Sequence, residues 1–119
     1  MKKIAFLFAF LFSILAINAQ NASSPNQERA HVQAIRMQKS LALSQEQTDK
    51  VETVFLNHLN EFEKIKADQN LSKEQKEAEF KKNQESKDAE LQKILTPEQF
   101  NRYQEMLKER REQRAQSGQ

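Results

Sequence analysis

The sequence predicts an all-α protein, and three observations carry that prediction. The 119 residues include one glycine and two prolines, so little interrupts a helix and hairpin turns lack their usual residues. Gln, Glu, Lys, Ala and Leu, which suit helices better than strands, dominate the chain. The pattern S/T-x-x-Q of a helix-capping box occurs at four well-separated positions. We therefore expect four helices and no sheet.

The first nineteen residues have the pattern of a secretory signal peptide. Two lysines precede the apolar run Ile4–Phe12, which continues after a serine as far as Ile17. This run is short for a membrane span, and cleavage after Ala19 would leave Gln20 as the first residue. Because Ile17 is larger than the residue usually found three positions before a cleavage site, an uncleaved N-terminal anchor is the alternative. We expect an exported protein.

The remaining domain, residues 20–119, is electrically balanced and poor in large apolar residues. Residues 1–19 hold two of the 19 basic residues and none of the 17 acidic ones, so 17 of each remain. This balance makes nucleic acid a poor partner. The chain has no cysteine, which excludes disulfides and thiol redox chemistry. Because so few apolar residues form only a thin core, we expect a second copy to complete it, with partial disorder as the alternative.

The first helix is predicted from Pro25 to about Lys39, with Ser24 as its N-cap and proline at the first helical position. It presents two apolar faces. One face comprises Ala30, Ala34, Met37 and Leu41, and the other comprises Val32 and Ile35. Since one short helix with two apolar faces needs two partners, we expect one face to contact the subunit and the other a second chain, unless it is simply exposed.

The second helix is predicted from Gln45 to about Gln69, and it has the clearest apolar stripe. At about 100° per residue, one face holds Val51, Val54, Phe55, His58, Phe62 and Ile65, with Leu59 at its edge. His58 lies inside this stripe with no second ligand nearby in sequence, so we interpret it as a core or interface histidine. His31 is expected in solvent.

The third and fourth helices are predicted from Lys73 to about Lys93 and from Pro97 to about Arg114. The third is apolar mainly at its two ends, and its middle, residues 81–90, depends on helix propensity and charge pairs. The fourth has a shorter apolar stripe and ends in basic residues. Flexible segments are expected at residues 20–23 and 115–119.

Three of the four capping boxes follow a leucine, which gives the pentapeptide L-[ST]-x-x-Q. The copies are LSQEQ at Leu43–Gln47, LSKEQ at Leu71–Gln75 and LTPEQ at Leu95–Gln99. In each, the hydroxyl can accept from the backbone N–H three residues on, and the glutamine can accept from the cap's own N–H. The leading leucine can pack back on the first turn. The role expected for these residues is architectural: Leu43, Ser44, Gln47, Leu95, Thr96 and Gln99.

No pattern for catalysis, cofactor binding or metal binding accompanies these helices. The sequence lacks a glycine-rich phosphate loop, zinc-ligand spacing and a nucleophile with a base partner. Its acidic residues have the spacing of solvated helix faces. We therefore expect neither an enzyme nor a cofactor or metal protein.

Arginine occurs only in the first and fourth predicted helices, whereas the middle two carry only lysine. Arginine stacks on apolar surface and pairs with carboxylates more readily than lysine does. Methionine, which adapts to irregular partners, occurs in both of these helices at Met37 and Met106. The two helices are thus expected to offer a mixed basic and apolar surface, although each charge alone also suits simple solubility.

The LSQEQ and LTPEQ pentapeptides, opening the second and fourth helices of an exported chain, resemble the paired L-T-x-x-Q motifs of the Spy/CpxP family of periplasmic proteins. Ser44 stands where that family favours threonine. The resemblance implies thin, curved helical hairpin-type subunits that pair as an antiparallel homodimer. The concave, cradle-like face of such a dimer binds unfolded proteins without ATP. Some members instead inhibit an envelope-stress sensor or bind zinc, but the zinc binders are rich in histidine and this chain has two.

These observations lead to a primary hypothesis and an alternative. The first is an ATP-independent periplasmic chaperone that binds unfolded or partly folded proteins and suppresses their aggregation. From composition, the candidate client-binding residues are Arg36, Met37, Lys39, Arg102, Met106 and Arg110. The alternative is a periplasmic accessory regulator that docks on a stress-responsive or metal-responsive membrane sensor. A structural coiled coil is disfavoured because no heptad pattern persists.

Overall fold

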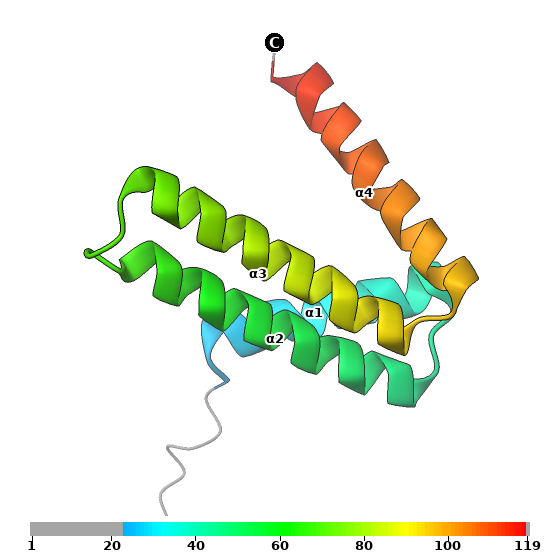
Figure 1. The fold of residues 1–119 in the computed structure, drawn as a ribbon. Helices are drawn as coiled ribbons and strands as arrows, with labels where there is room; N and C mark the ends of the chain where they lie inside the picture. The colour runs from blue at the N-terminus through cyan, green and yellow to red at the C-terminus, as the bar shows by residue number, and fades with distance from the viewer. Residues whose placement is uncertain (1–22, 119) are drawn as a thin grey trace, which may run out of the picture.

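The computed structural model describes residues 23–118, and this part of the chain consists of four helices without a strand. They are α1 (Pro25–Leu41), α2 (Gln45–Ala67), α3 (Lys73–Ile94) and α4 (Pro97–Ser117). α2 and α3 run side by side as a long hairpin, α1 packs along α2, and α4 departs from the end of α3 (Figure 1). The predicted all-α class is confirmed. The expected signal peptide lies outside the described residues.

All four predicted capping boxes begin a helix. In each, the hydroxyl of the cap accepts from the backbone N–H of the third helical residue, whose side chain accepts from the backbone N–H of the cap. The four pairs are Ser24 with Gln27, Ser44 with Gln47, Ser72 with Gln75, and Thr96 with Gln99. Because capping uses only neighbouring residues, the sequence predicted these starts to the residue.

The helix ends differ from the expected positions by one to three residues. α1 continues beyond Lys39 and ends at Leu41, because the next residue, Ala42, adopts a left-handed conformation with φ of 53°. The Leu43 N–H then donates to the Gln38 carbonyl at 3.1 Å, the long bond of a Schellman motif. α2 stops two residues early and α3 extends by one. α4 extends three residues beyond the expected Arg114 to Ser117, so residues 115–117, which were expected to be flexible, are helical.

The core is concentrated where the ends of all four helices meet. It contains residues from every helix and both leucines that precede α2 and α4. The largest fully enclosed side chains are Leu91 of α3 and Val51 and Thr48 of α2. The Thr48 hydroxyl donates to the Ser44 carbonyl at 2.8 Å, which satisfies this buried polar group. At the far end of the hairpin, and within residues 23–118, α2 and α3 pack only against each other (Figure 1).

The buried face of α2 is rotated from the predicted stripe. Leu59, expected at the edge of the stripe, is 7% exposed, whereas Phe62, expected within the stripe, is 37% exposed. Val54 and His58 are half-buried. The cause is tertiary: α2 packs against α1 and α3 at once, so its most enclosed line lies between two neighbours. Phe62 instead stacks on Phe80 of α3, with ring centroids 4.7 Å apart.

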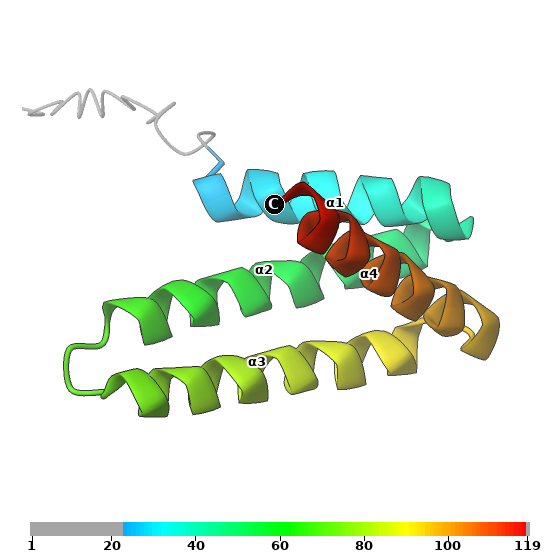
Figure 2. The same cartoon turned by 90° about the horizontal axis from the view of Figure 1, so that it is seen from above.

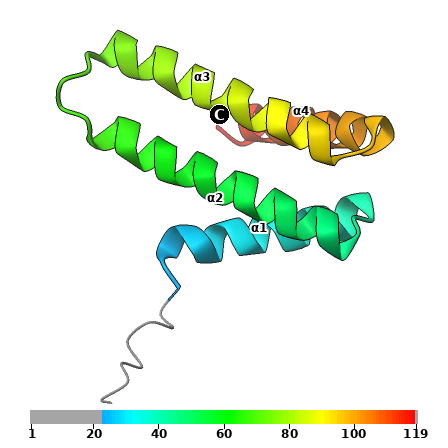
Figure 3. The ribbon, with the colours of Figure 1, turned by 60° about the horizontal axis from the view of Figure 1, so that its bottom comes forward.

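The four helices form an open arrangement with α4 crossing one end. Viewed from above, α1 lies along α2 on the side away from α3, and α4 runs from the junction across to α1 (Figure 2). Figure 3 shows the same hairpin with its far end covered by no other helix. The buried residue of α4 is Tyr103, and every residue from Lys108 to Gly118 is exposed. Among the described helices, none has the length and apolar character to cross a bilayer.

Candidate functional site

The two pentapeptides that open α2 and α4 lie together, and their leucines are buried. Leu43 and Leu95 are 7% and 5% exposed and belong to the core. Each follows the end of one helix and precedes the start of the next. The ends of α1 and α3 and the starts of α2 and α4 thus form one junction.

The glutamines of these pentapeptides join the two helix starts directly. The Gln47 side-chain amide donates to the Gln99 side-chain oxygen at 2.8 Å and to the Ile94 carbonyl, the last of α3, at 3.2 Å. The Gln99 amide donates to the Leu41 carbonyl, the last of α1, at 3.3 Å. Each glutamine therefore caps its own helix and also binds the C-terminus of the helix that precedes the other pentapeptide. Such carbonyls lack a partner within their own helix.

The third pentapeptide lacks these additional bonds. Gln75 accepts from the Ser72 N–H at 2.8 Å, as the capping box requires, and it is exposed. Leu71 is only half-buried. LSKEQ therefore caps α3 at the far hairpin turn, whereas LSQEQ and LTPEQ form the junction.

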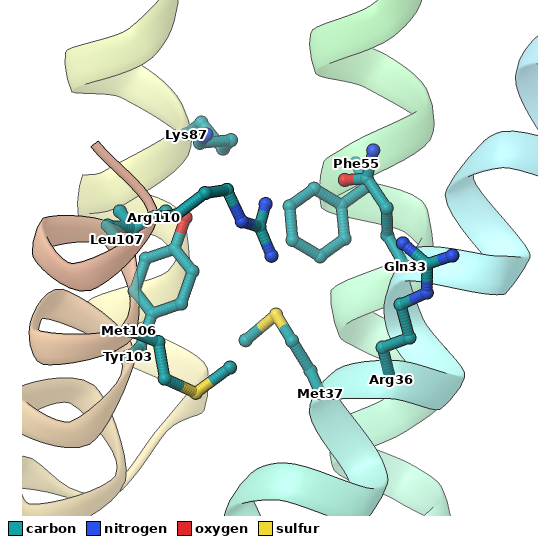
Figure 4. Close-up of a pocket in the computed structure, with 9 residues that line it drawn as sticks. All are labelled: Gln33, Arg36, Met37, Phe55, Lys87, Tyr103, Met106, Leu107 and Arg110. Carbon is teal, nitrogen blue, oxygen red and sulfur yellow. The ribbon is translucent and has the colours of Figure 1, made fainter. Parts of the chain in front are cut away.

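A cleft of about 130 Å³ opens beside this junction, and all four helices line it. α1 contributes Gln33, Arg36 and Met37; α2 contributes Phe55; α3 contributes Lys87; and α4 contributes Tyr103, Met106, Leu107 and Arg110. In Figure 4 the Arg110 side chain extends from α4 toward the Phe55 ring, and the Met37 sulfur points into the same space. The cleft has three basic side chains, no acidic one, and an apolar floor.

Four of the six residues chosen from composition as client-binding candidates meet in this cleft. Arg36 and Met37 face Met106 and Arg110 across it. Lys39 and Arg102 are exposed and line no part of it. The sequence assigns Arg36 and Met37 to α1 and Met106 and Arg110 to α4, but only the packing of α4 against α1 brings the two pairs together.

Five residues that line the cleft were not among the sequence candidates: Gln33, Phe55, Lys87, Tyr103 and Leu107. Lys87 lies in the run expected in solvent, yet its Nζ is 5.9 Å from the centre of the Phe55 ring and donates to the Gln84 side chain at 3.2 Å. Burial lowers the pKa of Lys87; nearby Arg110 and Arg111 lower it further, while Asp88 opposes them. Burial also raises the pKa of Tyr103, whose buried hydroxyl has no hydrogen-bond partner.

The two histidines occupy different environments. His31 is exposed, as expected, and its Nδ1 lies 2.9 Å from Glu52 of α2. His58 is half-buried between α2 and α3, and its buried Nδ1 has no partner. Burial, followed by the charge of Lys87, lowers the pKa of His58. Within residues 23–118, no three His, Asp or Glu side chains gather as metal ligands would.

Comparison with known families places the chain in one of them. Residues 16–103, which are more than half of the chain, match the family model described as a domain of unknown function, DUF4890. The chain belongs to the DUF4890 family. Both junction pentapeptides lie inside the DUF4890 match, whereas the part of α4 that carries Met106, Leu107 and Arg110 follows it. No curated protein and no solved structure matches the chain.

Proposed function

We propose that this protein is an ATP-independent periplasmic chaperone that binds unfolded or partly folded proteins and limits their aggregation. The observation that carries the proposal is the adaptable basic and apolar surface shared by α1 and α4. Methionine and arginine from both helices line one cleft there, and the distal half of α4 is uncovered. Such a surface offers many weak contacts to unrelated chains.

The resemblance of the paired pentapeptides to the Spy/CpxP family supports the same function. The hydrogen bonds of Gln47 and Gln99 supply a physical reason for two pentapeptides rather than one. Each glutamine binds the last carbonyl of the helix that precedes the other pentapeptide. The junction positions α4 against α1, and this contact creates the surface proposed for clients. In this proposal Leu43, Ser44, Gln47, Leu95, Thr96 and Gln99 act on binding only through the fold.

We further propose that two subunits pair as an antiparallel homodimer. Val32, on the second apolar face of α1, is 41% exposed, and Phe62 is 37% exposed. Exposed single apolar residues are ordinary, but here they accompany a core that is thin away from the junction. A second copy would cover part of this surface and leave a shared concave face for clients.

An aggregation assay tests the proposed chaperone function. A reduced or heat-denatured model protein is mixed with protein comprising residues 20–119 at near-stoichiometric ratio, and light scattering is followed at low and high salt. We expect strong suppression that weakens as salt screens the cationic residues. The double variant Arg36→Gln/Arg110→Gln should suppress aggregation less than the parent.

The matched control is Lys81→Gln/Lys82→Gln, which removes the same charge from exposed positions of α3. Each lysine pairs only with a nearby surface glutamate, so stability should change little. Suppression should match the parent. If the parent fails to suppress aggregation at any ratio, the chaperone proposal is wrong, and a dedicated regulator of a membrane sensor becomes the better reading.

A further inference from the structure

The cleft between the four helices has the composition of a binding site for a small amphipathic anion. Its basic residues, Arg36, Lys87 and Arg110, come from three different helices. None of the three makes a salt bridge with an acidic side chain of residues 23–118, although carboxylates are plentiful on the surface. Cations gathered from separate elements without a salt-bridge partner or an acidic lining residue favour an anionic ligand.

Burial increases this preference. Lys87 is half-buried against the Phe55 ring, so water solvates its ammonium group poorly. Tyr103 is 4% exposed and keeps a buried hydroxyl without a partner. Burial is the largest cause of the lowered pKa of Lys87; the negative charge of nearby Asp88 opposes it, and the charges of Arg110 and Arg111 add to it. A carboxylate in the cleft would supply a negative charge among the lining cations and an acceptor for the Tyr103 hydroxyl.

The floor of the cleft indicates that the rest of the ligand is apolar. Met37, Phe55, Met106 and Leu107 provide thioether, aromatic and aliphatic surface around the same space. The volume of about 130 Å³ is close to that of a protein cavity known to hold one benzene ring. An inorganic anion would leave this apolar surface unused, and a plain hydrocarbon would leave the cations unpaired.

We propose that this cleft binds a small carboxylic acid that carries one phenyl-sized apolar group. The ring occupies the space between Met37 and Phe55, and the carboxylate lies toward Arg110 and Lys87. The planar guanidinium of arginine can hold a carboxylate through two parallel hydrogen bonds. This site is independent of the proposed chaperone function, since a free acid can bind whether or not unfolded proteins do.

The chain offers a built-in probe for this site. Tyr103 is its single tyrosine, and the sequence has no tryptophan, so intrinsic fluorescence reports on the cleft alone. Hydrocinnamate is titrated into protein comprising residues 20–119, with calorimetry as a second readout. We expect saturation at one molecule per chain, and binding of the neutral analogue hydrocinnamide that is weaker by about tenfold or more.

Two variants locate the site. Arg110→Gln should weaken hydrocinnamate binding about tenfold, because it removes one charge-assisted pair from an exposed residue without opening the core. Arg114→Gln removes the same charge one turn further along α4, outside the cleft, and should leave binding unchanged. Circular dichroism confirms that both variants remain helical.

Three results would overturn the assignment. These are no saturable binding of hydrocinnamate, equal binding of hydrocinnamide, or equal weakening by both arginine variants. A peptide with a C-terminal phenylalanine and a free carboxylate is the last arm of the test. If that peptide binds while hydrocinnamate does not, the cleft recognises chain ends and the proposal of a free acid is wrong.

Discussion

At the scale of single residues, Gln47 and Gln99 explain why the pentapeptide occurs twice at one junction. A capping box needs only the side-chain oxygen of its glutamine, which leaves the amide group free. Here the Gln47 amide donates to the Gln99 side chain and to the last carbonyl of α3, and the Gln99 amide donates to the last carbonyl of α1. The pair thus combines local capping with a tertiary contact.

This double role predicts unequal effects for the same substitution. Gln47→Ala removes the bond that its side chain accepts from the Ser44 N–H, the bond to Gln99 and the bond to the Ile94 carbonyl, so the free energy of unfolding should fall by about 2–3 kcal/mol. Gln75→Ala removes only the exposed bond from the Ser72 N–H and should cost less than about 1 kcal/mol. Urea unfolding followed by circular dichroism measures both, and equal losses would contradict the tertiary role.

The sequence predicted the residues of this junction but not the bonds between them. Ser44, Thr96 and both glutamines follow from local capping rules, which involve residues within three positions. The Gln47–Gln99 contact spans 52 positions, and nothing in either pentapeptide specifies it. Lys87 was missed for a related reason: its neighbours in sequence are polar, and only the packing of α3 on α2 brings it to Phe55.

At the scale of elements, the end of α1 contains a strained residue that can be tested. Ala42 adopts φ of 53°, a conformation that costs an L-residue roughly 1–2 kcal/mol and costs glycine far less. Ala42→Gly should therefore raise the free energy of unfolding by about 1 kcal/mol after the greater freedom of unfolded glycine is included. As the control, Ala89→Gly in exposed α3 should lower it by about the same amount. A loss in both variants would contradict the left-handed cap.

The packing of α2 on α3 predicts a pH dependence that involves His58. Burial and Lys87 lower the pKa of His58 in the folded state, while Asn83 and then Asp88 oppose them. The unfolded state then takes up the proton more readily, so the stability contribution is complete above about pH 6.5 and is lost as pH falls below it. Urea unfolding measured from about pH 8 down to about pH 5 should show this loss in the parent.

Two variants assign that pH dependence to one histidine. His58→Gln has no titrating group at this position, and its stability should vary less over the same range. His31→Gln alters only the exposed histidine beside Glu52 and should retain the loss caused by His58. A parent protein whose stability rises as pH falls through this range would have the sign opposite to the one that burial dictates.

The elements also show where periodicity is a sufficient guide. The buried face of α1, comprising Ala30, Ala34, Met37 and Leu41, matches the prediction because that helix buries a single side. The face of α2 does not match, since α2 lies between two neighbours and its position relative to them decides whether Leu59 or Phe62 is enclosed. A pattern along one helix contains no information about the direction of the second neighbour.

At the scale of the whole molecule, the helices form an open layer held together at one end. The core extends from the junction along the contact between α1 and α2, the far end of the α2–α3 hairpin has no other helix against it (Figure 3), and the distal half of α4 is exposed. In our account, other polypeptides complete this layer: a second copy covers one face, and unfolded clients bind the other.

Sedimentation equilibrium of protein comprising residues 20–119, over a wide range of concentration, tests this claim most directly. The account predicts a reversible dimer whose mass falls toward that of one chain on dilution, with dissociation promoted by a charged replacement at the exposed Val32, such as Val32→Glu. A stable monomer at every concentration, unaffected by Val32→Glu, would contradict it.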